Sequence, residues 1–259
     1  MFWNFETLRD YGLHATDGHI GQISDIYFDD RDWTVRYVVV DTGTWLPGRK
    51  VLIPPGELGE PEPGRRDLPI GITRQQVKDS PDISTDRPVS RQEEESLHAY
   101  YGWAPYWGGP MVAGWGGIPA GAPMVPPPGS APVPPTGPGA DARPQEETHG
   151  DPHLRSGREI EGYHIAAEDG SIGHVEDYLI DHAWHVRYLI IDTRNWLPGR
   201  KVVVAPDWVR RIDWAAREVE VDLTREQIRN SPEYDPLTQL DRGFEQQLYG
   251  YYGRMPYWI

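Results

Sequence analysis

The stretch Trp45-Leu46-Pro47-Gly48-Arg49-Lys50 recurs unchanged as Trp196-Leu197-Pro198-Gly199-Arg200-Lys201, at an offset of 151 residues (196 minus 45). The same offset relates five further pairs of segments: Val35-Arg36-Tyr37 and Val186-Arg187-Tyr188, Thr73-Arg74 and Thr224-Arg225, Ser80-Pro81 and Ser231-Pro232, Tyr100-Tyr101-Gly102 and Tyr251-Tyr252-Gly253, and Pro105-Tyr106-Trp107 and Pro256-Tyr257-Trp258. Chance does not keep one register over so many pairs, so the chain carries two copies of one module.

The two copies differ by one residue upstream of this register. Asp17-Gly18 matches Asp169-Gly170 at an offset of 152 (169 minus 17), so the first copy holds one more residue before its tryptophan. The extra residue falls in the acidic segment Asp29-Asp30-Arg31-Asp32. Hairpin loops tolerate such insertions, which indicates that this segment is a loop between two strands.

Short strands dominate the pattern within each copy. In the second copy, residues 172–180 alternate as a half-buried strand does, and residues 184–191 are predicted to be its antiparallel partner. Leu197-Pro198-Gly199-Arg200 has the chemistry of a type II turn and leads into strand 201–204. Two more strands are expected at 208–214 and 218–223. We expect each copy to close into a small antiparallel barrel around its own apolar interior, because an open sheet would expose its edges.

Two short helices are expected after the strands of each copy. Thr73-Arg74-Gln75-Gln76 and Thr224-Arg225-Glu226-Gln227 both fit a capping box, and a Ser-Pro pair ends each of these helices. Apolar residues at helical spacing then mark a second helix: Leu97, Tyr100 and Tyr101 in one copy, and Phe244, Leu248, Tyr251 and Tyr252 in the other. This aromatic C-terminal flap is expected to pack on its own barrel or on the other copy.

Proline, glycine and alanine dominate the stretch between the copies, as in Met124-Val125-Pro126-Pro127-Pro128-Gly129. Such a segment buries too little apolar surface to offset its ordering entropy, so residues 108–157 are predicted to be a disordered linker. Its run 126–135 also has the composition of a ligand for an aromatic groove. The predicted organisation is a first module at 1–107, the linker, and a second module at 158–259.

Charge and composition narrow the class of protein. The 259 residues include 40 acidic and 25 basic side chains, for a formal net charge of -15, which argues against sequence-independent nucleic-acid binding. The pairs Arg65-Arg66 and Arg210-Arg211 are expected to be solvated surface. The absence of cysteine excludes disulfides and thiolate chemistry. No stretch reaches the roughly 18 apolar residues of a membrane span and no signal-peptide pattern is present, so a cytoplasmic location is expected.

The side chains that could bind a metal do not form a complete ligand set. Asp29-Asp30-Arg31-Asp32 lacks the turn glycine and the terminal glutamate of an EF-hand loop. The pairs His182/His185 and His149/His153 have no further histidine or cysteine at the spacing of a tetrahedral site. Nucleotide-binding glycine motifs and a nucleophile elbow are missing from the sequence. We therefore expect no catalytic residue, no metal and no cofactor.

The copies diverge most after the strand that ends in proline. Three apolar residues of the second copy, Trp208, Ile212 and Trp214, align with Glu57, Pro61 and Pro63 of the first. Because proline removes a backbone donor, this strand is expected to be ragged in the first copy. Exposed Trp and Arg concentrate binding energy, which makes Trp208, Arg210, Ile212 and Trp214 candidates for a partner-binding surface. The alternative is that Trp208 and Trp214 only cover their own barrel.

An ordered set of short motifs, present twice, resembles the PRC-barrel family, which is named for the reaction-centre H subunit and includes a ribosome-maturation factor. The set comprises the Asp-Gly-x-Ile-Gly segments at Asp17 and Asp169, the aspartates Asp25 and Asp177, the Arg36-Tyr37 and Arg187-Tyr188 strands, and the proline-ended strands at Ile53-Pro54 and Val204-Ala205-Pro206. The resemblance implies a closed, mostly antiparallel barrel that serves as a binding adapter.

The resulting expectation is a non-enzymatic protein-interaction or scaffolding protein. Its two barrels would act as an intramolecular pseudo-dimer or as separate docking units, with a protein partner whose identity the sequence does not give. Two alternatives stay open: an RNA- or ribosome-associated factor, and a component of photosynthetic reaction-centre assembly or electron transfer. The chain has neither the membrane helix of the reaction-centre relative nor the N-terminal domain of the ribosomal one, so neither role transfers directly.

Overall fold

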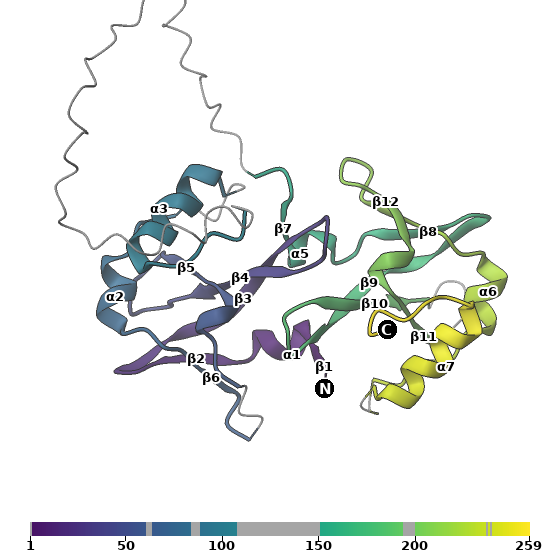
Figure 1. Ribbon diagram of the computed structural model, residues 1–259, viewed down its shortest axis with the longest axis horizontal. Helices are drawn as coiled ribbons and strands as arrows, with labels where there is room; N and C mark the ends of the chain where they lie inside the picture. The colour runs from purple at the N-terminus through teal and green to yellow at the C-terminus, as the bar shows by residue number, and fades with distance from the viewer. Residues whose placement is uncertain are drawn as a thin grey trace, which may run out of the picture.

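The computed structural model describes residues 2–60, 64–83, 89–107, 151–193, 200–236, 238 and 240–259, without the side chain of Gln92. Two sheets lie side by side, with short helices at the outer end of each and two more helices between them (Figure 1). The chain is therefore mainly β, as the sequence predicts. None of the helices in these ranges has the length and apolar character needed to span a membrane.

The first sheet contains six strands, ordered β5-β4-β3-β2-β6 with β7 paired to β3. These are β2 (Gly12–Ala15), β3 (Gly18–Asp29), β4 (Val35–Asp41), β5 (Lys50–Ile53), β6 (Asp67–Pro69) and β7 (Leu154–Ser156). The helices of this half are η1 (Pro55–Glu57), α2 (Arg74–Asp79) and α3 (Arg91–Tyr101).

The second sheet contains seven strands, ordered β11-β10-β9-β8-β13-β12 with β1 paired to β9. These are β1 (Phe2–Asn4), β8 (His164–Ala167), β9 (Gly170–Asp181), β10 (Val186–Asp192), β11 (Lys201–Val204), β12 (Val209–Asp213) and β13 (Glu218–Val221). The helices of this half are η2 (Pro206–Trp208), α6 (Arg225–Asn230) and α7 (Arg242–Tyr252).

Each sheet takes its last strand from the start of the other copy. β1 pairs with β9, where Trp3 lies opposite Ile180, and β7 pairs with β3, where Arg155 lies opposite Phe28. The helices α1 (Phe5–Arg9) and α5 (Gly157–Ile160) follow these strands and pack between the sheets. The exchange is reciprocal, so the two copies form one intramolecular pseudo-dimer.

The exchange corrects the predicted linker boundary. Residues 151–157 were expected to belong to the linker, yet they include β7 and the first residue of α5. The reason is local: Leu154 is buried, and the edge of β3 provides partners for the backbone of this short stretch. The rest of the predicted linker, residues 108–150, lies outside the described residues.

The strand pairing differs from the predicted antiparallel barrels in two respects. The pairs β2–β6 and β8–β13 are parallel, because the long connections within each pair allow a crossover. Among the described residues, no ladder joins the outer strands β5 and β6, or β11 and β12, so the sheets are barrel-like but not closed by hydrogen bonds.

The turn and the capping motifs that the sequence predicts form where the structure describes them. The backbone N–H of Arg49 donates to the carbonyl of Leu46 at 3.0 Å and Gly48 has φ +78°, as a type II turn requires. Of the matching turn 197–200, residues 197–199 lie outside the described residues. Both predicted capping boxes form, at Thr73 and at Thr224. The glycine that ends the Asp-Gly-x-Ile-Gly segment is forced by close packing, since a Cβ at Gly21 would lie 2.0 Å from the carbonyl oxygen of Asp41.

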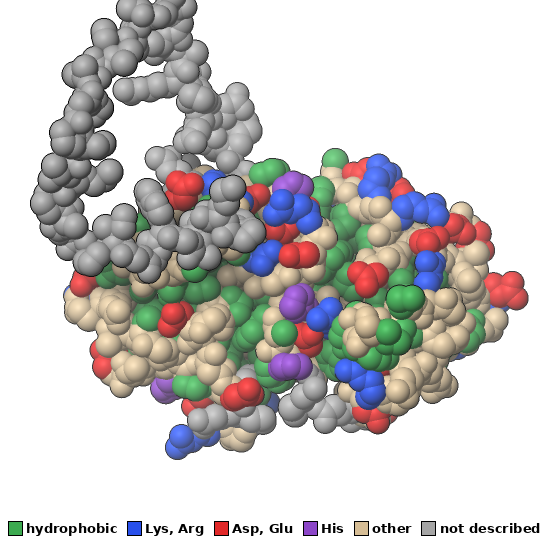
Figure 2. Space-filling view, in the orientation of Figure 1, with side chains coloured by type: hydrophobic (Ala, Val, Ile, Leu, Met, Phe, Trp, Pro, Cys, Tyr) green, Lys and Arg blue, Asp and Glu red, His purple; other side chains and the backbone are tan. Residues whose placement is uncertain are grey.

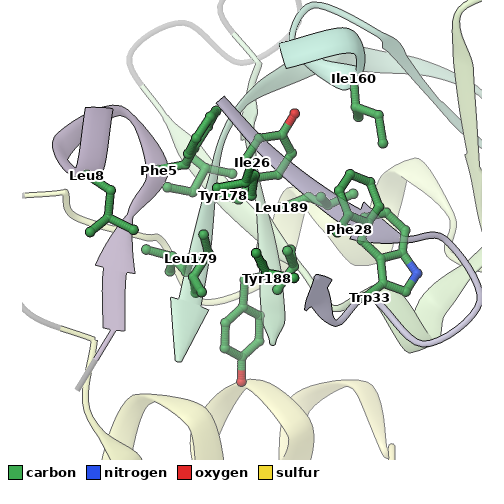
Figure 3. Packing of buried hydrophobic residues seen from close by; sticks show 14 of the residues in the cluster. Phe5, Leu8, Ile26, Phe28, Trp33, Ile160, Tyr178, Leu179, Tyr188 and Leu189 are labelled. Carbon is green, nitrogen blue, oxygen red and sulfur yellow. The ribbon is translucent and has the colours of Figure 1, made fainter. Parts of the chain in front are cut away.

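One large apolar core runs through both halves. It includes residues of both sheets, whereas a smaller second cluster around Tyr37 and Leu97 belongs to the first half. Figure 3 shows Phe5 of α1 next to Tyr178 of β9, with Ile26 of β3 close by, and the Phe5 and Tyr178 rings are 5.7 Å apart. The expectation that each copy encloses its own interior is therefore wrong. Since α1 and α5 supply apolar side chains across the boundary, the two interiors merge.

Candidate functional site

The aspartates Asp25 and Asp177 anchor the exchanged segments. Asp25 accepts hydrogen bonds from Ser156 Oγ at 2.5 Å and from the backbone N–H of Arg158 at 3.1 Å. Asp177 accepts matching bonds from Asn4 Nδ2 and from the backbone N–H of Glu6, both at 3.1 Å. Each aspartate thus satisfies free N–H groups at the start of a short helix from the other copy. Burial raises the pKa of both carboxyls, although these hydrogen bonds act against it.

The hairpin tips of β3–β4 and β9–β10 also meet. The backbone N–H of Val35 donates to the carbonyl of Trp184 at 2.8 Å, and that of Val186 donates to Trp33 at 2.9 Å. Trp33 and Trp184 both have positive φ, 57° and 60°, which is unfavourable for a residue other than glycine. The same unfavourable conformation at both tips places a tryptophan carbonyl where it accepts a backbone hydrogen bond from the other copy.

The acidic loop of the first hairpin is largely paired rather than solvated. Asp29 is buried and forms ion pairs with Arg31 at 2.6 Å and Arg36 at 3.5 Å. Asp30 contacts His153 Nδ1 at 2.8 Å and Arg155 at 3.3 Å, both from the segment around β7. The loop is a hairpin tip, as predicted, and it also receives the exchanged segment.

A buried glutamate fastens the C-terminal flap of the first half to its own sheet. Glu94 of α3 accepts hydrogen bonds from Tyr37 at 2.9 Å and from Tyr106 at 2.6 Å, and it pairs with Arg91 at 3.0 Å. His98 Nε2 lies 2.8 Å from the Tyr37 hydroxyl. Burial raises the pKa of Glu94 and lowers that of His98, so the histidine is neutral at pH 7.

The second half repeats this arrangement on α7. Glu245 accepts from Tyr188 at 2.8 Å and from Tyr257 at 2.9 Å, and it pairs with Arg242 at 3.2 Å. Tyr249 stands where the first half has His98. Both flaps therefore pack on their own half of the molecule, which decides between the two alternatives that the sequence left open.

A groove opens in the first half next to the hairpin tip of the second. It has a volume of about 370 Å³, and its walls include Pro54, Pro55, Trp103, Tyr106 and Trp184. We call it the Trp103 groove. The lining also includes Gly56, which has no side chain, and three polar residues, Glu57, Arg36 and His98. Figure 2 shows hydrophobic side chains gathered along the boundary between the two halves on the face in view.

The equivalent position in the second half is almost filled. Its cavity measures about 60 Å³ and is lined by the matching residues, among them Trp33, Pro206, Tyr249 and Tyr257. Asp207 stands where the groove has Gly56, and Trp208 stands where it has Glu57. Trp208 turns inward, with its ring 4.7 Å from that of Tyr252. At this position the first half therefore has an open groove and the second half has a closed counterpart.

The four residues predicted to form a partner-binding surface do not share one exposed face. Trp208 is 2% exposed and belongs to the core. Ile212 is partly buried against the same core. Arg210 is exposed and pairs with Glu168 at 2.6 Å and Asp222 at 3.3 Å. The strand β12 does form in the second half, whereas residues 61–63 of the first lie outside the described residues.

Trp214 lies apart from the other three, at the junction of the two halves. Its ring is 6.0 Å from that of Tyr163 and 4.1 Å from the guanidinium carbon of Arg155. Arg155 also reaches Asp30 of the first hairpin. Trp214 thus contributes to holding the exchanged strand β7.

The described residues offer no gathered set of ligands for a metal ion. His153, of the first predicted pair of histidines, contacts Asp30. His185, of the other pair, pairs with Asp181 at 3.7 Å. His149 lies outside the described residues.

Sequence reasoning predicted the flap helices but missed the walls of the groove and the buried glutamates and arginines that fasten the flaps. The offset of 151 carries Glu94 to Glu245 and Arg91 to Arg242, at spacings that put both on one helix face, so this signal was present. By contrast, nothing in a single sequence places Trp184 beside Trp103, because the contact depends on how the halves pack.

Comparison with known families gives one match. The family model described as PRC-barrel domain matches residues 13–67, which run from β2 through β6 and confirm the resemblance for this segment. No curated protein matches the chain.

Proposed function

We propose that this chain, with its PRC-barrel domain at residues 13–67, is a non-enzymatic protein-interaction or scaffolding protein whose two modules act as one body. The second module is part of this proposal, since it repeats the strand order of the first as β10-β9-β8-β13. PRC-barrel domains generally serve as interaction or assembly modules. The cytoplasmic location expected from the sequence remains part of the same proposal.

The observation that carries the proposal is the Trp103 groove at the junction of the halves. Strand exchange fixes Trp184 of one copy against the proline and aromatic residues of the other, and so creates a surface that neither copy has alone. Largely preformed concave sites with aromatic walls and few polar groups are typical of binding. The Tyr37 hydroxyl donates to Glu94 and contacts His98 behind the groove, which helps to fix the wall that carries His98.

Affinity purification followed by mass spectrometry tests the proposal. A Gly56→Trp variant fills the groove, and a Cβ at Gly56 meets no atom within 4 Å, so the variant should fold. Asp207→Trp is the matched control at the closed counterpart. We expect a partner that is recovered with wild type and with Asp207→Trp but is lost with Gly56→Trp. Recovery of no specific partner with wild type would contradict the proposal.

The alternative role in RNA binding gains no support from the described surface. Arg210 and Arg211, the basic pair noted in the sequence, are both paired with carboxylates. Their charge is therefore largely compensated, and the net charge of -15 repels phosphate.

A further inference from the structure

We propose that the Trp103 groove binds a proline-rich segment of a partner protein that carries a lysine or arginine beside its prolines. This inference rests on the proposed function and names the class of partner. Its support comes from the rigidity of the walls, the engagement of their polar atoms, the charge at one end and the contrast with the second half.

The aromatic walls are held rigid by contacts with neighbouring side chains. Trp103 stacks on Tyr101 with ring centres 4.1 Å apart and an interplanar angle of 12°. Tyr106 is fixed through its hydroxyl to Glu94, and the guanidinium carbon of Arg36 lies 4.4 Å from the centre of its ring. Flat, preorganised rings suit the polyproline II helix, which is itself stiff and loses little entropy on binding.

The polar atoms of the two aromatic walls, Trp103 and Tyr106, are already engaged. The Trp103 indole N–H donates to Glu57 Oε1 at 2.7 Å, and the Tyr106 hydroxyl donates to Glu94. A ligand with many backbone N–H groups would leave them without partners, at a cost of about 1–3 kcal/mol for each buried group. Proline has no backbone N–H, so a proline-rich segment avoids this cost.

The charge at the end of the groove favours a cationic ligand. Among the described residues, Glu57 pairs with no lysine or arginine, whereas Arg36 is neutralised by Asp32 at 2.7 Å and Asp29 at 3.5 Å. The lining therefore carries uncompensated negative charge at Glu57. The net charge of -15 adds a field that attracts a basic segment.

The closed counterpart shows that the open groove depends on particular residues. A volume of about 370 Å³ lies in the usual range of ligand sites, about 300–1,000 Å³, and about 60 Å³ lies well below it. The same backbone supports both positions, so the side chains that differ between the halves make the difference. Gly56, Glu57, His98 and Trp103 of the groove have as counterparts Asp207, Trp208, Tyr249 and Arg254.

Calorimetric titration of the full chain with a synthetic decaproline flanked by arginines tests the inference. We expect saturable binding that weakens about tenfold or more in Gly56→Trp and stays within about twofold in Asp207→Trp. Glu57→Gln should weaken the arginine-flanked peptide by about threefold to tenfold and leave unflanked decaproline unchanged. Circular dichroism melts confirm that each variant is folded.

Three results would overturn the inference. Wild type that binds no peptide, or Gly56→Trp that binds as well as wild type, would exclude the groove as the site. The third result concerns the chain's own prolines in residues 126–135. If replacing them with serine raises the affinity for the peptide about tenfold, the groove binds that run of the chain and not a partner. If purification still recovers a partner that depends on Gly56 while the peptide does not bind, the proposed function stands and the proline-rich class is wrong.

Discussion

The Trp103 groove and its closed counterpart are built on the same strands, turns and flap, yet one is open and the other is filled. Trp208 and Tyr249 pack into the second position, and Glu57 and His98 occupy the matching places in the first. The buried glutamates and the exchange aspartates are instead the same in both halves. Residues that hold the scaffold are thus duplicated, and several of the residues that line the groove have diverged.

The largest expected effect is a difference in the free energy of unfolding between substitutions at the two positions. Trp208→Ala should lower the free energy of unfolding by about 3–5 kcal/mol, because it removes a core aromatic side chain. Glu57→Ala should cost about 1 kcal/mol, since it removes one hydrogen bond from Trp103. Urea denaturation followed by circular dichroism measures both. Equal losses would mean that the two positions do not differ in role.

The buried glutamates should respond alike in both halves. Glu94→Leu and Glu245→Leu each leave two tyrosine hydroxyls and an arginine without their buried partner, so each should cost about 2–4 kcal/mol. Glu→Gln at either position keeps an acceptor and should cost less. The same denaturation experiment applies. Sensitivity in only one half would show that the flaps are not equivalent.

Asp29 and the pair Asp25 and Asp177 should give opposite pH dependence. Burial raises the pKa of Asp25 and Asp177 above 3.8, so their contribution to stability is full below that value and is lost as pH rises through the raised pKa. Burial also acts to raise the pKa of Asp29, but hydrogen bonds and charge from Arg31 lower it to about 2. Its contribution is present above pH 3.8 and is lost as pH falls toward about 2.

Urea midpoints measured across this pH range test the contrast between Asp29 and the pair Asp25 and Asp177. Asp29→Asn should flatten the loss of stability between about pH 4 and about pH 2, and Asp25→Asn should flatten the decline above about pH 4. Asn at either position keeps an acceptor oxygen, so the variants are expected to fold. A steeper loss of stability at low pH in Asp29→Asn would contradict the role given to Asp29.

The smallest effect is expected at Arg210, three residues before the edge strand β12 ends. Its pairs with Glu168 and Asp222 are exposed, and such pairs contribute little once salt screens them. Arg210→Ala should leave the thermal midpoint unchanged at physiological salt. A clear drop would show that this arginine protects the sheet edge.

Much of the fold follows from local pattern. The offset of 151 residues, the capping boxes at Thr73 and Thr224, and the turn at Pro47-Gly48 depend on neighbours in sequence, and all are met where the structure describes them. The candidate site was predicted poorly. Trp208 has the composition of a binding residue, but whether a tryptophan faces solvent or core depends on what packs over it, here Tyr249 and Tyr252.

The sequence by itself determined that the chain holds two like modules, rich in strands and free of cysteine, because repeats, periodicity and composition are local properties. Only the tertiary structure decided that β1 and β7 change places and that the two interiors merge. The strand that starts one copy fits the edge of either sheet equally well by pattern. The choice is made by contacts more than 100 residues apart, such as Asn4 with Asp177 and Ser156 with Asp25.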